Sequence, residues 1–148
     1  MATSHEDIIS ALDELVATCR DGEEGLRAAA EAAQNAELRG LFLTYAQQRG
    51  DFRAELEEEI RRLGGTPSTR GSIAGSHRGW MSVRSAVGGG SDDSVVAEAK
   101  RGEDAAKRAY QAALDRELPP PIRAIVERQS ARIREAQDRV RSLRERAA

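Results

Sequence analysis

The chain has 148 residues, enough for one domain with a single core. Its formal net charge is −2, whereas a general nucleic-acid binder is strongly basic. Aromatic residues make up only 3% of the chain and apolar residues 39%, which favours helices packed through small aliphatic side chains over a β-sandwich.

The first predicted helix covers residues 5–33. A capping hydroxyl at Thr3 or Ser4 precedes Glu6 and Asp7, two acids that suit the positive end of a helix dipole. Apolar positions then recur at the spacing of one helix face: Ile8, Leu12, Leu15, Val16, Cys19, Leu26, Ala29, Ala30 and Ala33. We interpret Cys19, the single cysteine, as a small core residue within this stripe.

The second predicted helix covers residues 36–63 and ends at Gly64 and Gly65, with Pro67 close behind as a further stop signal. Its apolar stripe consists of Leu38, Leu41, Phe42, Tyr45, Phe52, Leu56, Ile60 and Leu63. Because the break between the first two helices is short, we expect them to be antiparallel neighbours.

Residues 64–92 form a predicted connector that is rich in glycine and serine and carries three arginines and no acid up to residue 91. It also contains apolar residues that need a place to pack: Ile73, Trp80, Met81, Val83 and Val87. A short helix over residues 72–87, lying across the bundle, accounts for them better than a long structureless loop.

The connector also offers a candidate surface patch for phosphates or an acidic partner. Its residues are Arg70, His77, Arg78, Trp80 and Arg84. The interpretation that we favour is that Trp80 packs on the bundle while the arginines stay solvated.

The third predicted helix covers residues 93–117 and the fourth covers 120–146, with Pro119, Pro120 and Pro121 at the corner between them. The four stretches predict an all-α, single-domain, four-helix bundle over residues 1–148. The connector is long enough to cross the bundle, so the third helix is expected to run parallel to the second. Spacing alone leaves a simple up-down bundle open.

Charge is distributed unevenly along the chain. Residues 5–35 carry eight acids against two bases, whereas residues 119–148 carry four acids against eight bases. We interpret these as solvated faces whose opposite charges bring the first and last helices together.

One polar side chain in each predicted helix points along the apolar stripe. These side chains are Glu23, Arg49, Glu103 and Gln129. An isolated charge in a bundle core is costly. We therefore expect two carboxylates around the guanidinium of Arg49, with the amide of Gln129 completing the hydrogen bonds of a buried polar layer.

A metal site is the alternative interpretation of this layer, with Glu23 and Glu103 as candidate ligands of a degenerate di-iron or di-manganese centre. Such sites usually draw a Glu-x-x-His from each of two helices, but the inward positions here are Arg49 on the second helix and Gln129 on the fourth. A guanidinium in that place repels a metal cation. We expect no cofactor and identify no catalytic residue.

Several ordered motifs give the whole chain a resemblance to a bacterial family of ferritin-like four-helix bundles of unknown function. They are Cys19-Arg20-Asp21-Gly22-Glu23-Glu24-Gly25, Gln48-Arg49-x-x-Phe52-x-x-Glu55-Leu56, Leu63-Gly64-Gly65-x-Pro67, His77-Arg78-Gly79-Trp80, Arg101-Gly102-Glu103, Tyr110, and Gln129 before Ala136-Gln137-Asp138. The resemblance implies a ferritin-like bundle with a long second connection and no established reaction. The chain departs from the family by lacking a histidine in the 136–138 stretch, which removes a possible ligand.

The sequence thus favours a non-enzymatic structural or interaction protein, with a role in stress response as a hypothesis. One cysteine and the absence of any apolar window near the ~18 residues of a membrane span predict a cytoplasmic location. Small-residue stripes suit close helix packing within one chain or between subunits, so a homo-oligomer is compatible with the pattern: Ala29, Ala30, Ala33, Ala99 and Ala106. The partner is unknown at this level.

Overall fold

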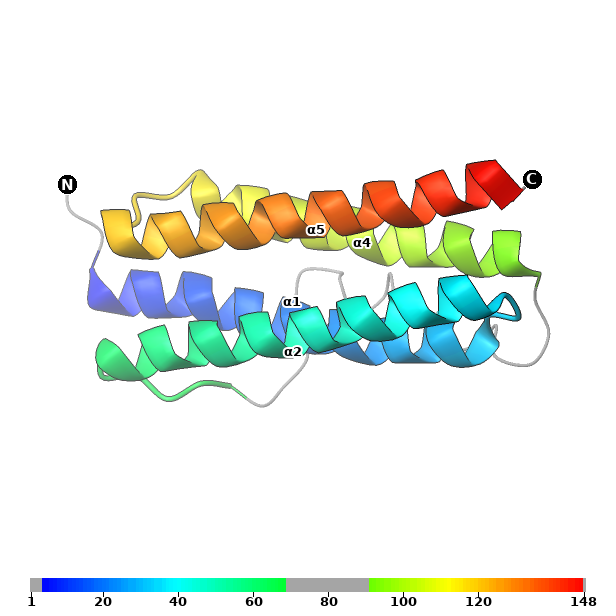
Figure 1. Cartoon of the computed structure of the whole chain (residues 1–148). Coiled ribbons are helices and arrows are strands. Elements are labelled where there is room, and N and C mark those ends of the chain that lie inside the picture. The colour runs from blue at the N-terminus through cyan, green and yellow to red at the C-terminus, as the bar shows by residue number, and fades with distance from the viewer. Residues whose placement is uncertain (1–3, 69–90, 148) are drawn as a thin grey trace.

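A computed structural model describes residues 4–68 and 91–147, and within these ranges the chain forms helices only. The four helices are α1 (His5–Ala32), α2 (Ala36–Arg62), α4 (Asp92–Leu114) and α5 (Pro120–Ala147). They pack side by side as an elongated bundle (Figure 1). The all-α, four-helix architecture predicted from the sequence is confirmed.

The direction of the helices settles the topology. In Figure 1, α1 and α5 run one way along the bundle, whereas α2 and α4 both run the other way. Because α2 and α4 are parallel, the end of α2 and the start of α4 lie at opposite ends of the bundle, as in a fold with one long crossover. The crossover arrangement is confirmed and the up-down alternative is wrong. The short helix expected over 72–87 lies outside the described residues.

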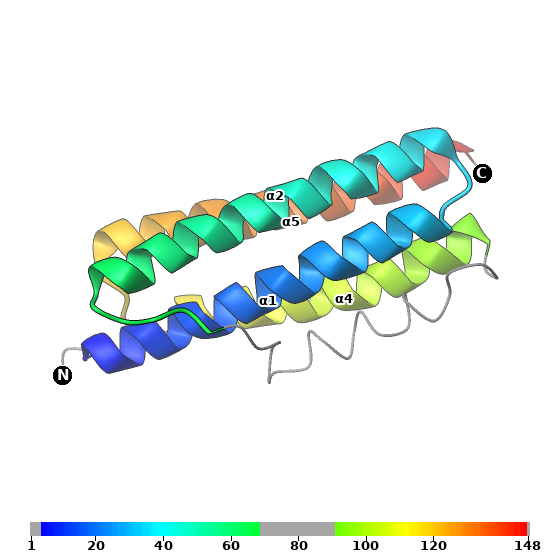
Figure 2. The same ribbon diagram turned by 90° about the horizontal axis from the view of Figure 1, so that it is seen from below.

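The first and last helices, which carry opposite charges, do not pack against each other. Helix α1 packs against α2 and α4, and α5 packs against α4 and α2, so α1 and α5 occupy opposite corners (Figures 1 and 2). The expectation that charge joins α1 to α5 is therefore wrong. The bases of α5 find acids on adjacent helices instead, as in the ion pair of Arg144 with Asp93 on α4.

Local signals set most helix ends where the sequence placed them. Ser4 and Asn35 cap α1 and α2, because their side chains accept hydrogen bonds from the backbone N–H of Asp7 and Leu38, respectively. Gly64 adopts a φ of 87°, which only glycine adopts at little cost, and this ends α2. Helix α4 ends at Leu114, earlier than the expected 117.

A side chain of the next helix, α5, binds the backbone at the early end of α4. Arg123 on α5 donates from Nη1 to the carbonyl oxygen of Leu114 at 3.0 Å. A cation there satisfies a backbone acceptor at the negative end of the α4 dipole. Helix α4 therefore ends at Leu114, before the three prolines at 119–121 that would stop it in any case.

Two apolar clusters fill the interior, one toward each end of the bundle. One contains Leu12, Leu56 and Ile133, and the other contains Leu26, Phe42 and Val140. On α2 the first cluster begins at Phe52 and the second ends at Ala46. The interval between these two residues holds Arg49, so the polar interior lies between the clusters.

Asp92 fastens the start of α4 to the turn between α1 and α2. Its carboxylate accepts from the backbone N–H of Gln34 at 2.7 Å and of Asn35 at 2.9 Å. The hydrogen bond from Gln34 is the main reason that the pKa of Asp92 lies below its ordinary value of 3.8. The tether thus favours the ionised carboxylate.

Replacing Asp92 with alanine is expected to lower the free energy of unfolding by about 1 kcal/mol at pH 7, because two backbone donors lose their acceptor. Since the folded-state pKa is depressed, this contribution is present above the unfolded pKa and is lost as the pH falls through the folded one. Urea unfolding should show a deficit at pH 7 that disappears near pH 2. A deficit that is equal at both values contradicts the carboxylate tether, and Asp51→Ala serves as the exposed control.

Candidate functional site

The centre of the bundle holds an ion pair between α2 and α4. Arg49 is fully buried and Glu103 is 5% exposed. The Nη2 group of Arg49 donates to Oε1 of Glu103. Burial alone would lower the pKa of Arg49, but the charge and hydrogen bond of Glu103 more than compensate and hold it above its ordinary value. The guanidinium of Arg49 therefore stays charged inside the core.

Helix α1 makes room for this guanidinium with a glycine. A Cβ atom added at Gly22 would lie 2.5 Å from Nη1 of Arg49, closer than real Cβ contacts come. Any side chain at this position on α1 would therefore displace the arginine. Among the described residues, Nε and Nη1 of Arg49 have no hydrogen-bond partner, so Glu103 alone anchors the buried cation.

Glu23 does not join this pair, which corrects the predicted layer. Its carboxylate accepts from Arg53 on α2 at 3.1 Å and from Arg27 one turn along α1 at 2.9 Å. The Glu23 side chain is 13% exposed. The inward position on α1 belongs to Gly22, so one carboxylate faces Arg49 instead of two.

Gln129 is fully buried as predicted, but it belongs to a second network. Its Oε1 accepts from the hydroxyl of Tyr110 at 2.7 Å, and its Nε2 donates to Glu55 at 2.8 Å. The Tyr110 hydroxyl in turn lies 3.1 Å from the sulfur of Cys19. Glu55 also pairs with Arg128, which is half exposed, so the network runs from the buried thiol to the surface.

Cys19 is a core residue in the structure, and its chemistry is that of an unreactive thiol. Burial raises its pKa to about 11, although the hydrogen bond with Tyr110 opposes the shift. Burial also raises the pKa of Tyr110 well above its ordinary value. Both groups are therefore neutral at physiological pH and act here as hydrogen-bonding partners.

The sequence pattern missed two contributors to the interior. Glu55 does not belong to the apolar stripe predicted for the second helix, yet the amide of Gln129 reaches it from α5. Asp21 is buried, at 3% exposure, although it does not lie on the predicted stripe of α1. No periodicity signal marks either residue, and the hydrogen bond of Glu55 comes from a side chain on another helix.

The candidate patch in the connector lies outside the described residues. This applies to Arg70, His77, Arg78, Trp80 and Arg84. His5, the other histidine of the chain, is exposed at the start of α1.

The donor set of the described interior does not fit a dinuclear metal centre. Within residues 4–68 and 91–147, no group of three or more histidine, cysteine or acidic side chains is placed to hold a metal ion. Glu103 faces a guanidinium, and Glu23 is engaged by Arg27 and Arg53. A cation at this level would have to displace an arginine that is already paired.

A family model matches residues 7–116, which include nearly all of α1, the whole of α2 and α4, and none of α5. The chain belongs to the family described as a domain of unknown function (DUF2383). The predicted membership of a family of unknown function is thereby confirmed. No functionally curated protein matches the DUF2383 chain in sequence. In the described ranges, no helix combines the length and the apolar character that a bilayer crossing requires.

Solved structures share the fold of the DUF2383 chain. One is a two-domain protein from Anabaena variabilis with DJ-1/ThiJ/PfpI-like and ferritin-like domains, with a TM-score of 0.78 and 18% identity over 98% of this chain and 38% of that one. Another is a dodecameric thioferritin, the bacterioferritin-related protein from Bacteroides fragilis, with a TM-score of 0.75 and 15% identity over 97% and 88% of the two chains. The DUF2383 chain spans well under half of the Anabaena protein. These likenesses show a ferritin-like fold.

Proposed function

We propose that the protein is a non-enzymatic, ferritin-like bundle that serves as a structural or interaction subunit in the cytoplasm. The single observation that carries the proposal is the buried pairing of Arg49 with Glu103. In metal-dependent bundles of this kind, inward carboxylates and histidines surround a cation supplied from solution. Here the cation is a side chain of the protein itself.

The space around this pair also supports a role without catalysis. A pocket lined by Glu103 and by mostly apolar residues, among them Leu26 and Val140, has a volume of about 80 Å³. Pockets that enclose a drug-sized ligand usually have at least about 300 Å³. The pocket therefore leaves little room for a substrate next to the charged pair.

Self-association is the form of interaction that we propose first. The thioferritin-like neighbour from Bacteroides fragilis is a dodecamer. The small residues Ala30 on α1 and Ala99 on α4 are buried between helices of one chain, so they do not supply the contact with another subunit. We propose that this protein also forms a homo-oligomer. Light scattering of the full chain would measure its oligomeric state. The hypothesis of a stress-related role stays a prediction.

Metal analysis separates this proposal from its main alternative, a degenerate di-metal protein. We expect protein from an iron- and manganese-supplemented culture, purified without chelator, to carry far less than one metal ion per chain by mass spectrometry. A Glu103→Gln variant should give the same background value. Two ions per wild-type chain, lost in Glu103→Gln, would overturn the proposal in favour of a metalloprotein.

A further inference from the structure

The outer seam between α4 and α5 carries a shallow, open groove on the face away from the polar interior. Its volume is about 430 Å³, and its lining residues are Asp104, Lys107, Arg108 and Gln111 of α4 and Arg134 of α5. Three of these five side chains are cationic and one is acidic. The groove therefore has basic groups on both of its walls.

The acid in the groove is already engaged by other groups. Asp104 accepts from Lys100 at 2.8 Å and from the amide of Gln137 at 3.1 Å, and it lies 3.4 Å from Lys107. Gln111 is likewise engaged, because its amide donates to Asp115. Asp104 thus neutralises the lysines beside it and leaves the two arginines without a counter-charge.

Arg108 and Arg134 are both exposed, and neither forms an ion pair or hydrogen bond with any described residue. Most arginines of α5 differ in this respect. Arg128, Arg132 and Arg141 each pair with an acid. Two guanidinium groups without a counter-charge therefore lie on opposite walls of one groove, whereas most other cations in residues 4–68 and 91–147 pair with an acid.

We propose that this groove binds a short chain of condensed phosphates. Planar guanidinium groups recognise phosphate oxygens with paired hydrogen bonds, and one on each wall suits a ligand with several phosphoryl groups in a row. The groove is too open to enclose a small organic molecule. It has no aromatic side chain among its lining residues on which a nucleic-acid base could stack, which favours an inorganic chain over single-stranded RNA.

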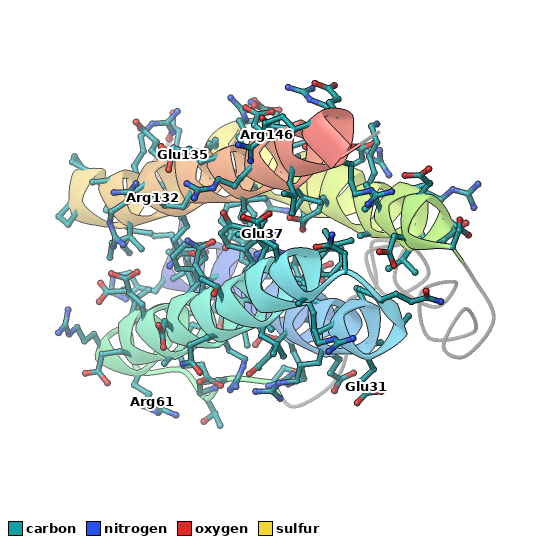
Figure 3. All side chains as sticks on the ribbon, turned by 45° about the vertical axis from the view of Figure 1, so that its right-hand side comes forward. Glu31, Glu37, Arg61, Arg132, Glu135 and Arg146 are labelled. Carbon is teal, nitrogen blue, oxygen red and sulfur yellow. The ribbon has the colours of Figure 1, made fainter. Side chains whose placement is uncertain are left out.

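The test is calorimetric titration of the full-length protein with tripolyphosphate at low ionic strength. Arg108→Gln and Arg134→Gln are each expected to weaken binding about tenfold, and the double variant more, because each removes a charge-assisted contact. Binding of the wild type should weaken as salt rises. Arg61→Gln is the matched control, since Arg61 is exposed and unpaired among the described residues but lies at the end of α2 (Figure 3).

Four outcomes overturn the inference. One is undetectable binding to the wild type, and another is an equal loss in Arg61→Gln, which would mark attraction by general charge. The third is tighter binding of single-stranded RNA than of tripolyphosphate. The fourth is equally tight binding of orthophosphate, because a two-walled site should favour a chain of phosphates. Far-ultraviolet circular dichroism of each variant confirms that these surface substitutions leave the helices intact.

Discussion

Replacing Arg49 with methionine should lower the free energy of unfolding by about 3–5 kcal/mol, the usual effect of removing one partner of a buried ion pair. The variant keeps a side chain of similar length but leaves the Glu103 carboxylate in the core without its counter-charge. Since Glu103 is 5% exposed, water cannot replace the lost partner at little cost. Urea unfolding followed by circular dichroism measures the difference.

Two further variants test whether the loss of stability comes from the unpaired charge of Glu103. Arg53→Met removes an arginine from the same helix that is 29% exposed and paired with Glu23, and it should cost at most about 1 kcal/mol. The double variant Arg49→Met with Glu103→Leu should recover most of the stability, because it removes both charges together. If the Arg49→Met protein were as stable as the wild type, the ion pair of Arg49 with Glu103 would not stabilise the core.

Replacing Gly22 with alanine should lower the free energy of unfolding by about 1–3 kcal/mol through overpacking against Arg49. Alanine normally stabilises a helix relative to glycine by about 1 kcal/mol. That gain is expected at Gly40 on α2, where an added Cβ meets nothing within 4 Å. The same substitution should therefore have opposite signs at Gly22 and Gly40 in chemical unfolding.

A double-mutant cycle assigns the effect at Gly22 to the arginine. In the Arg49→Met background no guanidinium lies against Gly22, so alanine there should cost clearly less than in the wild type. If Gly22→Ala stabilises the wild-type protein as much as Gly40→Ala does, the close approach of α1 to Arg49 has no energetic consequence.

Helix positions and topology were accessible from the sequence because their causes are local. Ser4, Asn35 and Gly64 act on the residues beside them, and helical spacing identifies the stripe that each helix buries. The length of the connector then favoured the crossover. The exception was the end of α4, where Arg123 from the following helix takes part.

The polar interior was only partly accessible, for a geometric reason. On α1, both Gly22 and Glu23 lie at three- or four-residue spacing from Cys19 and Leu26, so periodicity cannot decide which one faces the core. The structure places Gly22 against Arg49 and turns Glu23 toward Arg53. Which residue faces inward depends on the rotation of α1 against α2, which no local signal contains.

The second network depends in the same way on how helices align along their length. Cys19 was predicted as an apolar-stripe residue, Gln129 as buried, and Tyr110 as a motif residue of the family resemblance. Their hydrogen bonds join α1, α4 and α5, so they require the relative depth of three helices. The prediction that opposite charges join the first and last helices was wrong for a related reason. Core packing outweighs exposed charges in determining which helices are neighbours.

The thermal unfolding midpoint of chelator-treated protein, measured with and without added Mn²⁺ or anaerobic Fe²⁺, tests most directly whether Arg49 stands in place of a metal. A native-state ligand at a hundred times its dissociation constant adds about 2.7 kcal/mol to the free energy of unfolding, or roughly 5–10 °C for a chain of this size. We expect midpoints that agree within about 1 °C. A metal-dependent rise of about 5 °C or more that disappears in Glu103→Gln would contradict the substitution of a metal by the arginine.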